Sequence, residues 1–340
     1  MKAQVKSKLN LQDRVPLQDV IPIETPFLLY LDPSSVCNFK CKFCPTGHKE
    51  LLDQSNYKRN VMDFDFYCRI VDSLNDFSKP VKVLRMNKIG EPMLNRNLAN
   101  MVKYAKESGR VGYIDLATNA SMLTKDRGLE LVSAGLDRLN ISIEGVNAEQ
   151  YKEMCNVNID FDELVSNIRH LFVNKKNCEV TVKIPKNYLK GDDEKRFFEL
   201  FGDICDRIFV ENLAPIWPSF DVEGSSGVNI SNEGQYGVPP TEKLVCSYIF
   251  YAAAINADGT VSACCPDWDE KLVVGDLNKN TLKEIWNSKE FSDLRMLHLE
   301  GRRKENSVCA ACGHIKYSQV DDIDPFREQI KNKWVKQRKN

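Results

Sequence analysis

The placement of twelve cysteines constrains this chain of 340 residues more than any other feature of its sequence. Three of them, Cys37, Cys41 and Cys44, lie close together, and five more are spread over the C-terminal part of the chain. In a reducing compartment such groups indicate metal binding or catalysis rather than disulfides. The remaining four stand alone and are expected to be small buried apolar residues; they are Cys68, Cys155, Cys178 and Cys205.

The overall composition is that of an ordinary globular protein, with 42% hydrophobic and 28% charged residues. A formal net charge of -1 gives no reason to expect nucleic acid or membrane as a partner. The longest apolar runs, such as Phe27–Leu31, have the length of a strand and not of a membrane span. Residues 1–19 lack the apolar core of a signal peptide, so we expect a cytoplasmic location.

Short β-rich runs alternate with amphipathic helical patterns between about Phe27 and Leu213, which predicts βαβ units and a parallel sheet. The expected strands are Phe27–Leu31, Val81–Met86, Tyr113–Ala117, Arg138–Ile143, Glu179–Ile184 and Arg207–Val210. The expected helices include Tyr67–Asn75, Leu98–Ser108, Asp126–Ala134, Phe161–Asn174 and Asp193–Phe201. Six units are too few for a closed eightfold barrel. The predicted fold is therefore α/β, a partial (β/α)6 TIM-like barrel whose active site lies at the C-terminal ends of its strands.

The chain is expected to continue into a small second domain. Residues 215–240 are rich in Pro, Gly and Ser and are read as a linker. Beyond it, Asp258-Gly259 predicts a hairpin turn, and Thr281 with Glu284 predicts a capped helix start. Residues 326–340 resemble a basic, solvated surface helix. The predicted organisation is an N-terminal extension (1–25), the barrel (26–214), the linker (215–240), a C-terminal domain (241–316) and a basic tail (317–340).

The group Cys37-x3-Cys41-x2-Cys44 follows the first expected strand directly. A cubane [4Fe–4S] cluster normally takes four cysteines, so three leave one iron open to a ligand from outside the protein. Zinc is the alternative, since His48 is placed to complete four ligands. The spacing, with Phe43 before the last cysteine, resembles the signature of radical S-adenosylmethionine (SAM) enzymes. The resemblance implies that SAM binds the open iron and is cleaved to a 5′-deoxyadenosyl radical, which abstracts a hydrogen atom from the substrate.

Further segments carry the same resemblance. Gly90-Glu91-Pro92 ends the second expected strand and is similar to the family's Gly-Gly-Glu segment, although Ile89 stands in place of the first glycine. The resemblance implies that this segment holds the amino group of SAM. Polar residues at later strand ends are expected to contact its ribose, carboxylate or adenine, although each is also a common turn residue. The predicted cofactor-binding residues are Phe43, Gly90, Glu91, Pro92, Asn119, Ser142, Glu144 and Asn212.

The second group contains Cys246, Cys264 and a C-x2-C pair at Cys309 and Cys312. Four such thiolates can close around one [4Fe–4S] cluster or one structural zinc. The pattern resembles the SPASM and twitch domains that follow the barrel in some radical SAM enzymes. A full SPASM pattern has seven cysteines and two auxiliary clusters, so four ligands fit a shortened, twitch-like domain with a single cluster. Cys265, beside Cys264, is expected to pack, to replace Cys264 as a ligand, or to return a hydrogen atom to a substrate radical.

The resemblance, which covers about residues 26–316, predicts a radical SAM oxidoreductase. The leading hypothesis is dehydrogenation of a hydroxylated small molecule, such as a sugar or an aminocyclitol, with the auxiliary cluster taking the electron. Lys183 is the candidate base or substrate anchor, ahead of Lys186 and Arg85. The alternatives are epimerisation of a sugar with Cys265 as hydrogen donor, and modification of a peptide or protein side chain. A structural zinc protein or an iron–sulfur electron carrier is the non-enzymatic alternative. Radical chemistry would also require a reducing partner such as flavodoxin or ferredoxin.

Overall fold

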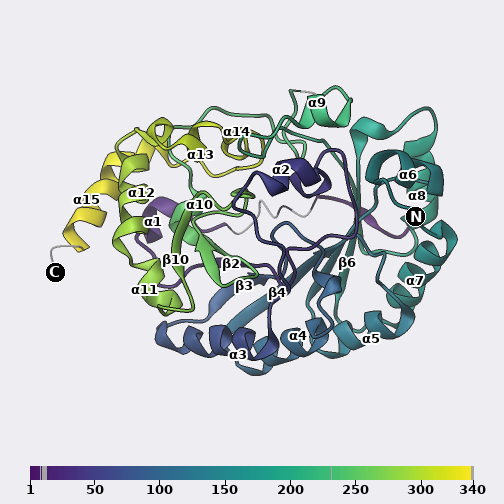
Figure 1. Cartoon of the computed structure of the whole chain (residues 1–340), viewed down its shortest axis with the longest axis horizontal. Helices are drawn as coiled ribbons and strands as arrows, with labels where there is room; N and C mark the ends of the chain where they lie inside the picture. The colour runs from purple at the N-terminus through teal and green to yellow at the C-terminus, as the bar shows by residue number, and fades with distance from the viewer. Residues whose placement is uncertain (8, 10–13, 231, 338–340) are drawn as a thin grey trace.

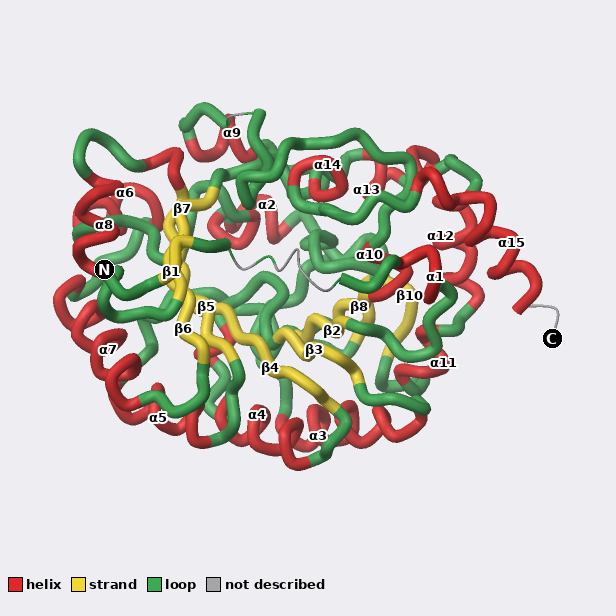
Figure 2. Tube along the Cα trace, turned by 180° about the vertical axis from the view of Figure 1, so that it is seen from behind, coloured by secondary structure: helices red, strands yellow, loops and turns green. Residues whose placement is uncertain are grey.

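The chain is built on one curved sheet. The computed structural model describes residues 1–7, 9, 14–230 and 232–337, and within these ranges ten strands are ordered β1-β7-β6-β5-β4-β3-β2-β8-β9-β10. Figure 2 shows them as a curved row with helices along its outer side. The strands are β1 Gln4–Val5, β2 Leu28–Leu31, β3 Val81–Arg85, β4 Val111–Thr118, β5 Arg138–Ser142, β6 Glu179–Pro185, β7 Arg207–Glu211, β8 Ala252–Ile255, β9 Thr260–Ser262 and β10 Val273–Asp276.

Helices α3 to α8 follow the outer side of the sheet, and α11, α12 and α15 lie together near β10 (Figure 1). The earlier helices are α1 Leu17–Val20, α2 Lys49–Asp53, α3 Phe64–Ser73, α4 Leu98–Glu107, α5 Lys125–Ser133, α6 Ala148–Cys155, α7 Phe161–Asn174 and α8 Asp193–Phe201. The later helices are α9 Val222–Ser226, α10 Tyr248–Tyr251, α11 Leu282–Trp286, α12 Lys289–Leu299, α13 Ser307–Ala310, α14 His314–Tyr317 and α15 Arg327–Gln337. Side-chain caps fix several starts: Asp63, Thr124 and Asp160 each accept a backbone N–H three residues later.

The barrel predicted from the sequence is confirmed. The six expected strands are β2 to β7, each within two residues of its predicted bounds, and β2 to β7 pair in parallel in chain order. Helices α7 and α8 have the predicted bounds. Helix α6 was not expected, although Asn147 caps it by accepting the backbone N–H of Gln150. A cap of this kind is a signal that the sequence offers.

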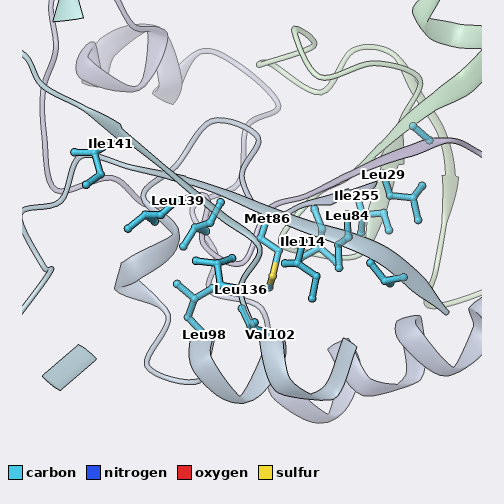
Figure 3. Close-up of a cluster of buried hydrophobic side chains, with 14 of the residues drawn as sticks. Leu29, Leu84, Met86, Leu98, Val102, Ile114, Leu136, Leu139, Ile141 and Ile255 are labelled. Atoms are coloured by element: carbon cyan, nitrogen blue, oxygen red, sulfur yellow. The ribbon is translucent and has the colours of Figure 1, made fainter. Parts of the chain in front are cut away.

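A single apolar core joins the sheet to its outer helices. Figure 3 shows side chains from β2 to β5 meeting side chains of α4, among them Leu84 and Ile114 above Leu98 and Val102. Ile255 of β8 lies in the same cluster, close to Leu29 of β2. The C-terminal part of the chain therefore shares its core with the barrel.

The C-terminal segment extends the barrel sheet directly. Strand β8 pairs in parallel with β2, with Leu29 opposite Ala253, and β9 and β10 follow as antiparallel neighbours. The β8–β9 hairpin turns at Asp258 and Gly259, as predicted, and Thr281 and Glu284 form the predicted capping box of α11. At the other edge, β1 pairs with β7. The open barrel is thus lengthened at both edges.

The basic tail is a helix, but it is not the solvated one that the sequence suggested. In α15, Ile330 and Trp334 are buried, and Trp334 meets the ring of Phe250 edge-on at 5.7 Å between centroids. Lys333 Nζ donates to the carbonyl oxygen of Gln18 at 2.8 Å. One apolar face is enough to dock an otherwise charged helix. Among the described residues, no helix combines the length and apolar character that crossing a membrane requires.

Candidate functional site

The first cysteine group lines a pocket at the C-terminal ends of β3, β4 and β5. Cys37, Cys41 and Cys44 face it from the loop after β2. Six of the eight predicted cofactor-binding residues line the same pocket: Phe43, Gly90, Glu91, Asn119, Ser142 and Glu144. The rest of the lining is Phe39, Thr46, Asn87, Lys88, Ile89, Ala117, Thr118 and Trp217. Parallel strands that end at one edge bring residues far apart in sequence to one place.

The three thiols are partly buried. Burial raises the pKa of Cys37 and Cys44 above the usual thiol value. For Cys41 the pKa is also raised, first by a hydrogen bond with Cys155 and then by burial. Because a metal binds the thiolate, loading iron at these positions must displace protons. Three partly buried thiols that line one polar pocket fit a [4Fe–4S] cluster that keeps one iron open.

The geometry of the first cysteine group supports a zinc site less well than a [4Fe–4S] cluster. His48, the fourth ligand that such a site would require, has its Nε2 bonded at 2.8 Å to the carbonyl oxygen of Lys42. Its ring packs on Phe220 at 5.2 Å between centroids. In the parts of the chain that the structure describes, no three His, Cys, Asp or Glu side chains converge tightly enough to hold one metal ion. A cubane is wider than an ion and takes its ligands farther apart.

Gly90 is required by close backbone packing. A Cβ atom at this position would lie 1.9 Å from the carbonyl oxygen of Ser34 and 2.6 Å from the carbonyl carbon of Ser35. The next residue, Glu91, donates its backbone N–H to Val36 at 2.9 Å. The segment after β3 therefore lies directly against the segment that leads into the cysteine loop, and only glycine permits that approach.

The Glu91 carboxylate ties the pocket wall together. It accepts hydrogen bonds from Thr118 Oγ1 at 2.7 Å, from the backbone N–H of Asn119 at 2.8 Å and from that of Met93 at 2.9 Å. A carboxylate offers about four acceptor positions, which leaves about one for a ligand. Asn119 Nδ2 in turn donates to Asn38 Oδ1 at 3.0 Å, which joins the end of β4 to the cysteine loop.

Glu144, Lys183 and Glu211 form a charged row across the ends of β5, β6 and β7. Lys183, the predicted base or anchor, makes an ion pair with Glu211. Burial raises the pKa of Glu144 to about 7; Lys183 lowers it and Glu211 raises it further. The buried oxygens Glu144 Oε2 and Glu211 Oε2 have no hydrogen-bond partner among the described residues. Such oxygens are costly unless a ligand or water satisfies them.

The structure does not bring every predicted residue to the pocket. Asn212 donates through Nδ2 to the carbonyl oxygen of Gly234 at 3.1 Å, so it binds the segment after β7. Pro92 is buried at the start of a short 3-10 turn. Neither residue is among those that line the pocket. Both remain predictions as cofactor-binding residues.

The second cysteine group is assembled from segments distant in sequence. Cys246 precedes α10, Cys264 follows β9, and Cys309 and Cys312 lie in and after α13. Burial raises the pKa of all four thiols. The pKa of Cys264, of Cys309 and of Cys312 is raised further by other members of the group, and Cys246 contributes to the rise at Cys309 and Cys312, which indicates that the four side chains lie close together. Gln319 Nε2 lies 2.9 Å from Cys246 Sγ. Four converging thiols are the donor set of a closed cluster.

Cys265 faces a different environment from its neighbour Cys264. Burial raises the pKa of Tyr248 to about 12, and the nearby Cys265 thiol adds to that effect. Cys265 acts in the same direction on Tyr30, whose pKa burial raises strongly. Both tyrosines lie close to Arg85, the last residue of the barrel strand β3. Cys265 therefore lies near these two tyrosines as well as near Cys264.

The two cysteine groups are linked by a short stretch of the predicted linker. The Cys312 thiol lies 3.9 Å from the carbonyl oxygen of Ile216, and the next residue, Trp217, lines the pocket of the first group. Trp268, which follows Cys264 in the chain, packs in a small apolar cluster against which Cys44 and Trp217 are placed. The walls of the two sites are thus in contact.

A buried polar chain provides a second link. Lys88 Nζ, in the pocket wall, donates to Asn256 Oδ1 at 2.5 Å. Asn256 Nδ2 donates to Ser262 Oγ at 3.2 Å, and Ser262 Oγ to Asp267 Oδ2 at 2.8 Å. Asp267 lies on the same loop as Cys264. Sequence analysis missed Lys88 and Trp217, although Lys88 stands only three residues before Glu91 and so offered a signal.

Two family models match the chain. That of the radical SAM superfamily matches residues 31–198, and that of an iron–sulfur cluster-binding domain, SPASM, matches residues 246–313. The chain belongs to the radical SAM family and carries a C-terminal SPASM domain. The family assignment made from the cysteine spacing is confirmed.

Individual relatives share 30% or less of their aligned residues with this chain in the two examples that follow. A tungsten-containing aldehyde ferredoxin oxidoreductase cofactor-modifying protein of Pyrococcus furiosus is 25% identical, over 86% of this chain and 90% of its own. A probable GTP 3′,8-cyclase of Saccharolobus islandicus is 30% identical over 44% of this chain, and the match spans 48% of the cyclase.

Solved structures share the fold at lower identity. BtrN in complex with AdoMet and 2-DOIA has a TM-score of 0.53 and 19% identity, covering 87% of this chain and 94% of its own. SuiB of Streptococcus suis bound to S-adenosylmethionine has a TM-score of 0.61 and 15% identity, and the match covers 88% of this chain and 74% of SuiB. SuiB has also been solved with the precursor peptide SuiA.

Proposed function

We propose that this enzyme binds SAM at the open iron of a [4Fe–4S] cluster held by Cys37, Cys41 and Cys44, and oxidises a hydroxylated small molecule. A second [4Fe–4S] cluster, held by Cys246, Cys264, Cys309 and Cys312, takes up the electron. The observation that carries the proposal is the contact between the two sites. Trp217 lines the pocket, and the carbonyl of the preceding residue, Ile216, touches the Cys312 thiol.

The net reaction removes two hydrogens from a carbon that bears a hydroxyl group. When bound, the cluster and SAM supply a 5′-deoxyadenosyl radical, which takes the hydrogen atom from that carbon and becomes 5′-deoxyadenosine. The hydroxyl proton would go to a base of the protein, and a cluster held by Cys246, Cys264, Cys309 and Cys312 would supply an acceptor for the remaining electron, so that the product is a ketone or an aldehyde. The chain's own residues bind SAM and the substrate, orient them toward each other and exclude water from the pocket.

Pocket residues divide into those that hold the cofactor and those that face the substrate. Gly90, Glu91 and Asn119 come from the wall that packs on the cysteine loop, and this supports a role in holding SAM. Lys183 is not among the residues that line the pocket; it lies next to them in an ion pair with Glu211, which favours a role as anchor rather than as base. Glu144, with its pKa raised by burial to about 7, is the better candidate to accept a proton at neutral pH.

The comparison with BtrN supports a small-molecule substrate, because that structure holds 2-DOIA and its fold covers nearly all of this chain. SuiB supports the alternative of a peptide substrate in the same way. We expect a flavodoxin or ferredoxin to deliver the reducing electron. The contact between the two sites favours oxidation, because a redox-neutral reaction needs no exit for an electron.

Anaerobic turnover with SAM and a panel of polyols and amino sugars tests the proposal. Oxidation predicts a product lighter by two hydrogen atoms, and deuterium from the oxidised carbon in 5′-deoxyadenosine. The matched control is Cys265→Ser, which should leave the yield unchanged. Cleavage of SAM with no oxidised product from the polyols, but with a modified peptide, would overturn the small-molecule proposal.

Cys265 supports a second candidate, the radical epimerisation of a sugar. Cys265 lies near Tyr30 and Tyr248 and is not one of the four proposed cluster ligands, which leaves its thiol available as a hydrogen donor. In H2O this reaction predicts a product with the same mass as the substrate. In D2O the product should carry one deuterium from the solvent. Cys265→Ser should then stop product formation and leave SAM cleavage in place.

A further inference from the structure

A fourth cysteine contacts the first cysteine group from outside its sequence motif. Cys155 is the last residue of α6, and its side chain is fully buried. The Cys41 thiol donates a hydrogen bond to Cys155 Sγ with 3.4 Å between the two sulfurs. No local sequence pattern connects Cys155 with the cysteine loop, because more than a hundred residues separate them.

The contact is built into the fold. The end of α6 also accepts two backbone hydrogen bonds from the cysteine loop, from Lys40 to the carbonyl oxygen of Cys155 at 2.9 Å and from Lys42 to that of Met154 at 3.0 Å. Asn156, in the left-handed conformation, ends the helix and leaves these carbonyls available. The loop residues on both sides of Cys41 are therefore fixed to the same helix end that carries the Cys155 thiol.

Loading iron reverses the direction of the bond between the two sulfurs. Cys41 must lose its proton to bind iron, so it becomes an acceptor only. A hydrogen bond between these two sulfurs would then have to come from the S–H group of Cys155, which lies 3.4 Å from the Cys41 sulfur. Hydrogen bonds to cluster sulfurs stabilise the more negative, reduced form of a cluster and raise its reduction potential. The structure places one such donor against one of the three ligands.

We propose that Cys155 is a positioning residue for the SAM-binding cluster. Its S–H group donates to the Cys41 sulfur, orients that ligand and raises the cluster's reduction potential, so that a biological reductant reduces the cluster more completely. The inference goes beyond the substrate reaction and rests only on the placement of a cluster at Cys37, Cys41 and Cys44.

The test is a potentiometric EPR titration of the anaerobically reconstituted full-length enzyme. SAM binds only the first cluster, so the EPR signal that changes when SAM is added belongs to that cluster. Wild type, Cys155→Ala and Cys155→Ser are compared. Cys205→Ala is the matched control, because Cys205 is also a buried thiol and donates to the carbonyl oxygen of Phe201 at 3.2 Å, outside the pocket.

We expect Cys155→Ala to lower the reduced-to-oxidised ratio of this cluster about tenfold at a fixed potential, a shift of about 59 mV for a one-electron couple. Cys155→Ser keeps a donor and should lie closer to wild type, while Cys205→Ala should match wild type. Equal potentials in all four proteins at equal iron content would overturn the proposal. A wild-type enzyme with no SAM-responsive EPR signal would also overturn the proposal. That result would reject the placement of the cluster itself, so it can be told apart from a failure of the Cys155 hydrogen bond alone.

If Cys155→Ala does not retain its iron, Cys155→Val replaces it, because valine fills the space without offering a donor. A potential for Cys155→Val equal to that of Cys155→Ser would contradict the proposal. A lower potential for Cys155→Val supports it.

Discussion

The two cysteine groups reach similar donor sets by different routes. The first is local: three thiols on one loop after β2, facing a pocket made by the ends of neighbouring strands. The second is global, because its four thiols come from segments before α10, after β9 and around α13. Three protein ligands leave an iron open for chemistry, whereas four close the cluster. The number of cysteine ligands therefore distinguishes the proposed reactive site from the proposed electron acceptor.

The largest effect is expected from the local group. Cys37→Ala should lower the production of 5′-deoxyadenosine to background, a loss of several orders of magnitude, because the cluster carries the chemistry. Iron at the second group should remain. Cys68→Ala is the control, since Cys68 belongs to neither group. Cleavage that survives in Cys37→Ala would place the reactive cluster elsewhere.

Breaking the second group should separate oxidation from cleavage. The double variant Cys309→Ala, Cys312→Ala should lose about four irons and its oxidised product. Its cleavage of SAM should stay within about threefold of wild type, because the two sites act through separate ligands. Iron analysis, circular dichroism and 5′-deoxyadenosine assays check this. Full iron content in the double variant would show that these cysteines hold no cluster.

A smaller effect is expected from the wall of the first pocket. Glu91→Gln replaces an acceptor of three hydrogen bonds with a group that is partly a donor, and leaves buried N–H or O–H groups poorly satisfied. We expect a loss of about 1.5–3 kcal/mol in binding free energy, which lowers SAM affinity about 12- to 140-fold. Equilibrium binding under anaerobic conditions measures it. The variant Glu163→Gln, on the outer helix α7, should leave affinity unchanged.

The smallest expected effect is a pH dependence at Glu144. Its pKa is raised by burial to about 7, so the carboxyl is neutral below that pH and charged above it. The sulfonium of SAM is positive, so SAM should bind more tightly as pH rises through 7, by up to about tenfold. Because Glu144→Gln cannot titrate, it should flatten this dependence. A wild-type affinity that stays constant from pH 6 to 8 would contradict the assignment.

The sequence predicted the barrel correctly, because strand-length apolar runs indicated β2 to β7. Residues proposed for the first site, such as Glu91 and Ser142, line one pocket because parallel strands end together, and their roles toward SAM stay predictions. The spacing of Cys37, Cys41 and Cys44 indicated a shared site without any tertiary information.

What the sequence could not provide depends on contacts between distant segments. Cys155 was read as a buried apolar residue, and it is buried, but its neighbour is Cys41. Cys68 was given the same reading and is only partly buried. The pairing of β8 with β2, and the approach of Trp217 to the pocket, follow from tertiary packing that no local pattern encodes.

The most direct test of the two-cluster account is anaerobic reconstitution with iron and sulfide, followed by metal analysis and incubation with SAM and dithionite. The account predicts about eight irons per chain and the formation of 5′-deoxyadenosine. About four irons with cleavage would remove the second cluster from the account. Folded protein that holds no iron and cleaves no SAM would contradict its central claim.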